Sequence, residues 1–292
     1  VRLKLLVRLK LNYLILINKN INKMPEGPEV RITVDQLNQL VSNTSLQAIN
    51  INSGRYSKKN PVGFPEFQSQ LPLKINSVNC KGKFIWFEIS NGWYIFNTLG
   101  MSGGWKLKKE KHRHLTFLYD NKEIHYTDVR NFGTFKFVKD KKELDKKLKE
   151  LGADVLTQEY TLPYIKKVLH DTKIQNKTIV EVLMNQKKFC GIGNYLKSEI
   201  LYECKISPHR LVKDLTNKDI VNIFENSKKI VLGSYNRGGG SSGNYTDLSN
   251  KKGTYHFELK VYTLLKDPLG HTIKKENTKD KRTTHWVPEL QI

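Results

Sequence analysis

Six short runs of β-branched and aromatic residues occupy the first half of the chain, and they restrict its fold more than any other feature. The runs lie at 46–51, 83–89, 93–98, 114–119, 123–127 and 134–138, with turn signals such as Ser-Asn-Gly at 90–92 between them. Short strands joined by tight turns are typical of antiparallel sheets, which pack or close to cover their apolar faces. We therefore predict an antiparallel β-sandwich or barrel in this half of the chain.

Helical patterns lie on both sides of these strands. Apolar residues recur at helical spacing from 28 to 41, which predicts an amphipathic helix before the first strand. After Lys139 the sequence KDKKELDKKLKELG indicates a helix that ends at Gly152, and helical patterns continue to residue 232. Strand-like texture returns in the tail, first in YHFELKVYTLL and then in RTTHWVPELQ.

We therefore expect an α+β protein with three folded parts after residue 23. A glycine-rich stretch, with its glycines at 238–243, is expected to form a loop. The expected parts are an N-terminal helix plus β-sandwich at 24–139, a helical domain with this loop at 140–252, and a terminal β-hairpin at 253–292.

Charge narrows the class of partner. Lys and Arg total 50 against 28 Asp and Glu, a formal net charge of +22. An excess of this size favours a polyanionic partner, nucleic acid first and an acidic membrane surface second. A solvated, lysine-rich surface is the alternative that charge alone leaves open. Cys80, Cys190 and Cys204 are far apart and form no C-x-x-C pair, which indicates a reducing, intracellular environment.

The first 23 residues differ from the rest. They hold six basic residues and no acid, and their longest uncharged run, 11–18, is shorter than the roughly 20 apolar residues of a membrane span. An organellar presequence and an amphipathic membrane anchor are two readings of this segment. Because Met24 is the first methionine and opens the sequence MPEGPE, we favour a third, in which translation starts there and 1–23 is absent from the mature protein.

Four separated stretches together indicate a family. They are MPEGPEV at 24–30, KGKFIWFEISNGWYIFNTLGMSG at 81–103, GIGNYLKSEILYECKISP at 191–208 and KRTTHWVPELQ at 281–291. In this order they resemble the formamidopyrimidine-DNA glycosylase and endonuclease VIII family. The PEGP start and the missing finger cysteines are closer to its endonuclease VIII-like branch. The resemblance implies a helix-two-turns-helix motif in the helical domain and a finger formed by the C-terminal hairpin.

The resemblance implies that Pro25 is the catalytic nucleophile. Removing a damaged base requires attack on the anomeric carbon of the sugar. An α-amino group, with a pKa near ~7.7–8.0, is partly unprotonated at neutral pH, whereas lysine is almost fully charged. Pro25 meets this need only if its nitrogen is free, so Met24 must be removed. From the residues alone, Pro25 would be read as a proline that opens a helix.

Two other residues are implied in the chemistry. Glu26 is expected to be the acid/base catalyst beside the nucleophile, and Lys83 is expected to contact the phosphate near the lesion as a compact point charge. Glu29 is a weaker candidate for orienting the site, and Lys81 ranks below Lys83. Without the resemblance, these residues would be read as helix-terminal and strand-terminal charges on the surface.

The DNA-binding residues implied by the resemblance lie in two places. Gly191 and Gly193 precede a helix whose N-terminus could bind phosphate, and Asn194 would hold the backbone at the flipped nucleotide. An ordinary turn capped by Asn194 is the alternative. Arg282, supported by Lys281, corresponds to the finger arginine that grips phosphates on either side of the lesion.

Three residues are expected to fill the space that a flipped base vacates. Met101, Arg130 and Phe132 correspond to the family's void-filling residues, because an arginine can pair with the widowed base while apolar side chains wedge the stack. Met101 and Phe132 would otherwise be read as core residues. The loop at 238–243 corresponds to one that caps the flipped base in some family members.

The expected finger lacks the residues of a zinc site. Val287 and Leu290 occupy the positions of a C-x-x-C pair, and the earlier pair is also missing. His271 and His285 alone cannot supply the four ligands of a tetrahedral zinc. We therefore expect no metal, with the hairpin held by packing of Trp286 and Val287.

The function expected from these features is a bifunctional DNA glycosylase and abasic-site lyase for oxidised bases. It would form a Schiff base through its N-terminal proline and cut damaged DNA by β,δ-elimination, as a monomer and without a cofactor. The first rival is a non-catalytic damaged-DNA-binding protein, expected if residues 1–23 stay attached. The second is a basic protein anchored to membranes by that segment.

Overall fold

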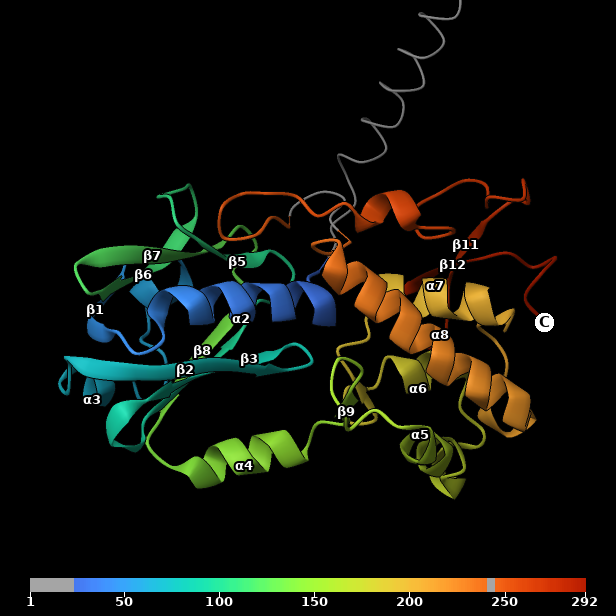
Figure 1. Cartoon of the computed structure of the whole chain (residues 1–292), viewed down its shortest axis with the longest axis horizontal. Helices are drawn as coiled ribbons and strands as arrows, with labels where there is room; N and C mark the ends of the chain where they lie inside the picture. The colour runs from blue at the N-terminus through green and yellow to red at the C-terminus, as the bar shows by residue number, and fades with distance from the viewer. Residues whose placement is uncertain (1–23, 241–244) are drawn as a thin grey trace, which may run out of the picture.

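The computed structural model describes residues 24–240 and 245–292, and it has two lobes (Figure 1). One lobe holds the β-sheet and the other holds most of the helices, and helix α2 (Gly27–Val41) begins beside the helical lobe and runs along the sheet lobe. The expected extension at 1–23 and residues 241–244 of the glycine-rich loop lie outside the described residues.

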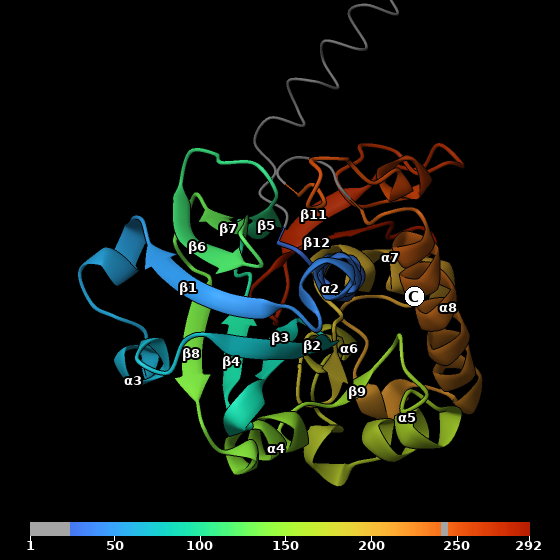
Figure 2. The same ribbon diagram turned by 60° about the vertical axis from the view of Figure 1, so that its left-hand side comes forward.

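The sheet has eight strands in the order β5-β7-β6-β1-β2-β3-β4-β8, and neighbouring strands are antiparallel. The strands are β1 (Ser45–Ile51), β2 (Leu73–Lys81), β3 (Phe84–Ile89), β4 (Tyr94–Thr98), β5 (Gly103–Lys106), β6 (Arg113–Tyr119), β7 (Lys122–Asp128) and β8 (Thr134–Val138). Strands β1 and β2 pair through Ser45 with Lys74 and Leu46 with Leu73. At this short seam the sheet folds into two four-stranded halves that face each other (Figure 2).

Aromatic side chains fill the space between the two halves. Trp105 of β5 is 1% exposed, and its ring centre lies 5.4 Å from that of Phe87 on β3 and 5.0 Å from that of Phe117 on β6. Its indole Nε1 donates to Asn97 Oδ1 at 3.1 Å, so the buried N–H is satisfied. Contacts between strands of both halves confirm the predicted α+β fold with an antiparallel β-sandwich.

The sequence signal was missing for two of the strands. Strand β2 carries Lys, Asn and Ser between its apolar residues, yet its inward positions Leu73, Ile75, Val78 and Cys80 are buried. Strand β5 begins with two glycines, which are typical of turns. A Cβ at Gly103 would lie 2.1 Å from the Tyr126 hydroxyl, so the crowded interior requires glycine there.

Helix α2 forms where the periodicity predicted it. Its start has a reciprocal capping box, in which Glu26 and Glu29 each accept a hydrogen bond from the other's backbone N–H. Its buried residues Val30, Val34 and Leu37 recur at helical spacing and pack against the sandwich core.

The second lobe is built from short helices around its own apolar core. Its α-helices are α5 (Leu162–Leu169), α6 (Ile179–Leu183), α7 (Asn194–Cys204) and α8 (Asn217–Asn236). Helix α4 (Lys141–Lys149) lies against the outer face of the sandwich, through Leu144 on Phe84 and Tyr94. The remaining small elements are α3 (Phe64–Gln68), η1 (Gly54–Ser57), η2 (Ser90–Gly92), η3 (Thr172–Ile174), η4 (Val212–Asp214), β9 (Ala153–Asp154) and β10 (Phe189–Cys190).

The expectation of a strand in YHFELKVYTLL is wrong. This stretch forms the short helix η5 (Tyr255–Glu258) and then turns. The carboxylate of Glu199 on α7 accepts the backbone N–H groups of Lys260, Val261 and Tyr262 at 2.9, 3.1 and 2.7 Å. Because one buried carboxylate takes these donors, they do not enter a strand ladder. The hairpin itself consists of β11 (Lys274–Asn277) and β12 (Thr283–Trp286).

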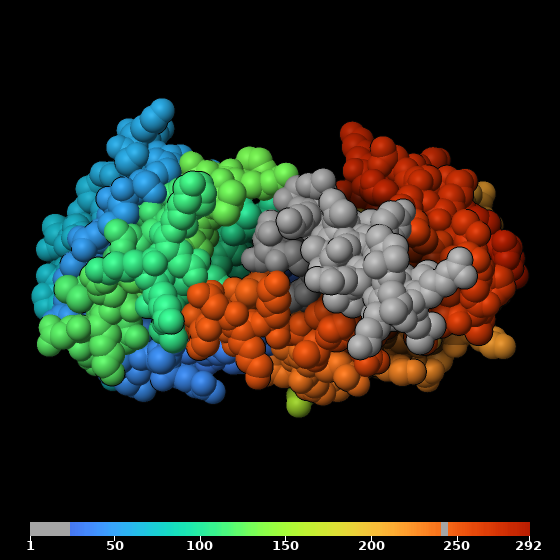
Figure 3. All heavy atoms as spheres, turned by 90° about the horizontal axis from the view of Figure 1, so that it is seen from above, coloured from blue at the N-terminus to red at the C-terminus, as the bar shows by residue number. Residues whose placement is uncertain are grey.

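A segment that follows α8 crosses back to the sandwich lobe. We call residues 245–250 the strap. Lys106 Nζ donates to the backbone carbonyls of Thr246 and Asp247, both at 2.9 Å, and the Tyr245 hydroxyl donates to the carbonyl of Glu29 at 2.9 Å. Leu248 is 2% exposed within the sandwich core. In Figure 3 this orange segment lies against the green part of the sandwich lobe.

We expect Leu248→Ala to destabilise the protein by about 2–5 kcal/mol, because it removes a buried side chain and leaves a cavity in the sandwich core. Denaturant unfolding would measure this change. Leu232→Ala is the matched control, since Leu232 is 51% exposed on α8. Equal stabilities of the two variants would show that the strap does not anchor in the core.

Candidate active site

Three backbone segments meet where α2 approaches α7. The Gly27 N–H donates to the Gly191 carbonyl at 2.9 Å. Gly191 has φ +93°, and a Cβ built at Gly82 would lie 2.6 Å from the Gly191 nitrogen. Glycine at these positions lets the chain before α2, the β2–β3 turn and the turn before α7 come into direct contact. The sequence-predicted residues Pro25, Lys83 and Gly193 are thereby brought to one place.

Glu26 joins the two lobes at this point. It is 3% exposed, and its Oε1 and Oε2 accept the backbone N–H groups of Tyr195 and Leu196 at 3.0 and 3.3 Å. These amides belong to the first turn of α7, where the helix dipole favours a negative charge. Burial nevertheless raises the pKa of Glu26 to about 7, with Lys83 opposing that shift and Glu29 adding to it.

Lys83 approaches Glu26 at Gly193, the residue before α7. Its Nζ donates to the Ile192 carbonyl at 3.0 Å. Burial lowers the pKa of Lys83, while the carboxylates of Glu26 and Glu29 raise it and Arg282 lowers it further. A Cβ built at Gly193 would lie 2.2 Å from Glu26 Cδ and 2.6 Å from Lys83 Nζ. Gly193 is therefore the surface against which both ionisable groups pack.

Glu29 connects the site to the base of the glycine-rich loop. Its Oε2 accepts the Glu26 backbone N–H at 2.8 Å, and its Oε1 accepts the Tyr195 hydroxyl at 3.0 Å and the Gly240 N–H at 2.6 Å. The Tyr195 hydroxyl also lies 2.9 Å from Ser234 Oγ of α8. Tyr195 and Ser234 were not predicted, because nothing local in the sequence marks them as partners of a glutamate far away in the chain.

Pro25 is buried and lines a cavity of about 270 Å³. Lys83, Leu99 and Gln186 also line the cavity. Gln186 holds the turn before α7, since its Nε2 donates to the Ile192 carbonyl at 2.8 Å and its Oε1 accepts the Gly191 N–H at 3.1 Å. The cavity therefore has the predicted nucleophile and the predicted lysine in its wall.

Asn194 connects α7 to the hairpin. The residue at the helix cap is Gly193, so the alternative reading of Asn194 as the cap is wrong. Asn194 Nδ2 donates to the Thr283 carbonyl at 2.9 Å, and its buried Oδ1 has no hydrogen-bond partner among the residues that the structure describes. Arg282 and Lys281 are exposed in the adjoining hairpin turn, where Lys281 has φ +59°.

Met101, Arg130 and Phe132 lie together on the loops that follow β4 and β7. Arg130 Nη1 donates to Met101 Sδ at 3.2 Å, and the Arg130 backbone N–H donates to Ser102 Oγ at 2.8 Å. Phe132 is 55% exposed and Met101 is half-buried. The alternative reading of Phe132 as a core residue is therefore wrong.

Apolar packing fills the root of the finger. Val287 is 0% exposed and packs with Val261, Ile273 and Tyr202, with Leu290 at the edge of this cluster. His271 Nδ1 lies 3.0 Å from Asp267 Oδ2. Within residues 24–240 and 245–292, no group of three His, Cys, Asp or Glu side chains could hold a metal ion.

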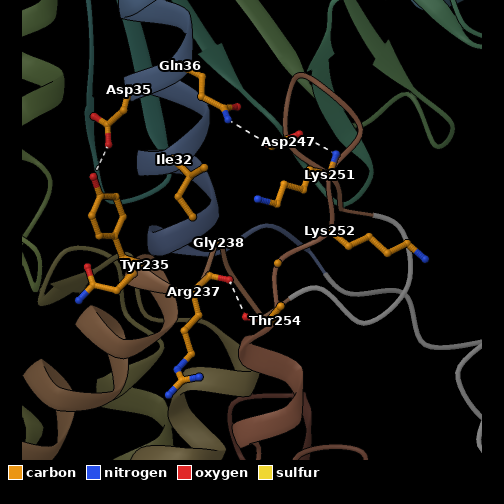
Figure 4. A pocket seen from close by; sticks show the side chains of 12 residues that line it. Ile32, Asp35, Gln36, Tyr235, Arg237, Gly238, Asp247, Lys251, Lys252 and Thr254 are labelled. Carbon is orange, nitrogen blue, oxygen red and sulfur yellow. Dashed lines mark hydrogen bonds between the residues drawn. The ribbon is translucent and has the colours of Figure 1, made fainter.

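A second hollow, of about 560 Å³, lies between α2, the end of α8 and the strap (Figure 4). Asp35 and Gln36 of α2 line it, with Tyr235 at the end of α8 and Asp247 of the strap. The Tyr235 hydroxyl donates to Asp35 at 2.7 Å and Gln36 Nε2 donates to Asp247 at 2.9 Å. None of the predicted catalytic residues lines this hollow, so it is separate from the site at Pro25.

Comparison with known proteins identifies the family. A model of the formamidopyrimidine-DNA glycosylase N-terminal domain matches residues 24–135, and a model of the formamidopyrimidine-DNA glycosylase H2TH domain matches residues 151–246. The chain belongs to the formamidopyrimidine-DNA glycosylase family. A formamidopyrimidine-DNA glycosylase of Listeria innocua is 32% identical over 279 residues, which cover 92% of this chain and 100% of that protein. One of Bacillus cereus is 30% identical over 92% of this chain and 99% of its own length.

Solved structures of this family have the same fold. A mutant Lactococcus lactis glycosylase in complex with Fapy-dG-containing DNA has a TM-score of 0.81, at 26% identity over 91% of this chain and 99% of that one. The Lactococcus lactis enzyme with abasic-site DNA has a TM-score of 0.80 at 25% identity, with the same coverage. These relatives carry the formamidopyrimidine-DNA glycosylase name, and the placement nearer the endonuclease VIII-like branch stays a prediction.

No helix within residues 24–240 and 245–292 is both long and apolar enough to cross a bilayer.

We expect Gly193→Ala to abolish most base-excision activity while the protein still folds. The added methyl group would occupy the space where the Glu26 carboxyl and Lys83 Nζ pack, so one of them must move. Cleavage of a lesion-containing duplex, with circular dichroism as the folding check, would measure both effects. Gly233→Ala on α8 is the control, because its Cβ meets Tyr255 at an ordinary 3.4 Å. A Gly193→Ala enzyme with full activity would contradict this account.

Proposed function

We propose that this glycosylase removes oxidised bases from DNA through the nitrogen of Pro25 and then cuts the strand by β,δ-elimination. Family membership carries the glycosylase and abasic-site lyase activity in base excision repair. The observation that supports the specific chemistry is the convergence of Pro25, Glu26 and Lys83 at the N-terminus of α7. Similar proteins that have been solved with Fapy-dG and abasic-site DNA support an oxidised-base substrate.

The first step is displacement of the base at C1′ of the deoxyribose. The Pro25 lone pair forms a C–N bond to C1′ while the glycosidic bond breaks and its electron pair leaves with the base. Because proline is a secondary amine, the imine that forms on ring opening is a permanently charged iminium. This charge acts as the electron sink for the elimination steps. The reaction requires a free Pro25 nitrogen, so the active enzyme must begin at Pro25, as it would if translation starts at Met24 and that methionine is removed.

Glu26 is suited to the proton transfer of ring opening. Its pKa of about 7 means that a sizeable fraction is protonated at neutral pH, unlike an ordinary glutamate. The protonated carboxyl delivers its proton to the ring oxygen O4′ as the C1′–O4′ bond breaks. The resulting carboxylate remains stabilised by the Tyr195 and Leu196 amides. Proton transfer by such a group contributes about 10²–10⁴-fold in rate.

Elimination follows from the iminium. Loss of a proton from C2′ expels the 3′ phosphate, and loss of a further proton from C4′ expels the 5′ phosphate. Lys83 lines the same cavity as Pro25 and Asn194 begins α7, and these two residues would hold the phosphates that flank the sugar. Arg282 and Lys281 would grip the strand from the finger. Arg130, together with Met101 and Phe132, would fill the vacated space in the duplex.

A single chain is proposed to be sufficient. Pro25, Glu26, Lys83 and Asn194 come from one copy of the protein and are held by contacts within that copy. No residue of a second copy is needed to complete the chemistry. We therefore propose that the enzyme acts as a monomer.

Borohydride trapping tests the nucleophile. Hydride reduces the iminium to a stable amine, so protein that begins at Pro25 should become covalently linked to DNA containing an abasic site. Protein that retains residues 1–24 should give no adduct, because its Pro25 nitrogen is an amide. Peptide mapping of the adduct should place the DNA on Pro25. Equal trapping of both forms would assign the nucleophile to a lysine such as Lys83 and would also leave the non-catalytic rival without support.

The pH dependence tests Glu26. We expect base excision to be bell-shaped in pH. The acid limb arises because the Pro25 nitrogen must be unprotonated to attack, and the alkaline limb arises because Glu26, whose pKa is raised to about 7, must be protonated. Glu26→Gln should lower the single-turnover rate by about 10²–10⁴-fold and remove the alkaline limb.

The control for this measurement is Glu225→Gln, an exposed glutamate on α8, which should leave the profile unchanged. A Glu26→Gln enzyme whose residual activity still falls above pH 7 would mean that another group supplies the proton.

A further inference from the structure

Helix α7 contains a lysine that is completely buried. Lys197 is 0% exposed, and it lies on the same helix as Asn194 and the amides that hold Glu26. An unpaired ammonium group in such a place would be strongly destabilising. Its Nζ instead donates to Asp280 Oδ2 at 2.6 Å and to Thr284 Oγ1 at 2.8 Å. The Lys197 side chain therefore reaches from α7, at the junction of the two lobes, into the hairpin.

Asp280 organises the turn of that hairpin. The side chain of Asp280 is 2% exposed, and its second oxygen, Oδ1, accepts the Thr278 hydroxyl at 2.5 Å. Thr278 Oγ1 also lies 2.6 Å from Thr284 Oγ1. Both carboxylate oxygens are thus used, and the two threonines on opposite sides of the turn are joined to the same ion pair. Such a fully satisfied buried network fixes one arrangement of the chain.

The turn carries the exposed basic residues of the finger. The Lys281 N–H donates to the Thr278 carbonyl at 2.8 Å, and the Thr278 N–H donates to the Arg282 carbonyl at 3.1 Å. The positive charge of Arg282 also lowers the pKa of both Lys83 and Lys197, so Arg282 is close enough to interact electrostatically with both lysines. The position of Arg282 relative to the active site is therefore set by the turn that Asp280 organises.

The two ends of the finger are held differently. Apolar packing of Val287 with Val261 and Ile273 fixes its root. At the tip, Lys281, Arg282 and Thr283 are exposed and contribute no apolar side chain to a core. The Lys197–Asp280 pair, together with Asn194 on the Thr283 carbonyl, supplies the tertiary contacts of the tip with α7.

We propose that Lys197 is a positioning residue, whose buried ion pair with Asp280 holds the finger tip so that Arg282 faces the DNA backbone beside the reacting sugar. The proposal rests on the proposed function, since it assumes that Arg282 contacts phosphate. Replacing only Lys197 or only Asp280 would leave the other charge buried and unpaired. That charge would destabilise the folded protein whether or not the pair positions Arg282. Replacing both by apolar side chains of similar volume is often neutral for stability.

The test is therefore the double variant Lys197→Met/Asp280→Leu. Its thermal midpoint should stay near that of the parent, while its Kd for a duplex with a non-cleavable abasic analogue should rise about tenfold, the loss of one charged hydrogen-bonded contact. The slope of log Kd against log salt should fall by about one, because one fewer phosphate is neutralised. Lys136→Met/Glu143→Leu, which removes an exposed ion pair of the sandwich lobe, should change neither quantity.

A cycle with Arg282→Ala shows whether Lys197 acts through the finger arginine. In the Arg282→Ala background, the double variant should weaken binding no further, because the contact it positions is already missing. Should the double variant fold and bind DNA with the parent's affinity and salt slope, or should its loss add to that of Arg282→Ala, the proposal is wrong.

The proposal and the proposed function fail in different ways. If Arg282→Ala alone leaves affinity and salt slope unchanged, the phosphate role of Arg282 is wrong and the inference is overturned with it. If Arg282→Ala weakens binding while the double variant does not, only the role of Lys197 is wrong. Should the double variant not fold, Thr284→Val removes one acceptor of Lys197 and should give a smaller change of the same kind, and no change would overturn the proposal.

Discussion

The hydrogen bonds between the Glu26 carboxylate and the first amides of α7 are the contact on which the rest of the site depends. They join the residue next to Pro25, the proposed nucleophile, to the helix that carries Asn194 and Lys197. The contact is possible because Gly27 and Gly191 allow the two backbones to touch. Each lobe therefore supplies half of the site, and neither half is complete without the other.

Burial of Glu26 and Lys83 at this junction shifts the pKa values of both groups. An ordinary glutamate at a helix N-terminus would ionise well below neutral pH, since the helix dipole and two N–H donors favour its charged form. Desolvation outweighs these effects at Glu26, and the same desolvation makes the neutral form of Lys83 more accessible. The protonation states of Glu26 and Lys83 therefore depend more on how completely the junction between the lobes excludes water than on any single charged neighbour.

The sequence predicted the fold best where local pattern and final environment agree. The strands rich in aromatic and β-branched residues and the amphipathic helix α2 were found, because each buries one face with its own period. Strand β2, with polar residues between its apolar ones, and the glycine-rich β5 were missed. The stretch after Thr254 was wrongly predicted as a strand, because the decisive partner, Glu199, is about 60 residues away in the chain. Pro25, Glu26, Lys83 and Asn194 could be named only through the family resemblance, and Lys197 in YLKSE would be read as a solvated charge.

The strap has a consequence for how the two lobes can separate. It leaves the helical lobe after α8 and inserts Leu248 into the core of the other lobe, with Lys106 clasping its carbonyls. A rotation that widened the gap on this side would draw an apolar side chain into water, at a cost of about 1.5–3 kcal/mol. The strap therefore adds apolar burial to the hydrogen bonds that already join the lobes at Glu26 and Gly27, and it opposes their separation.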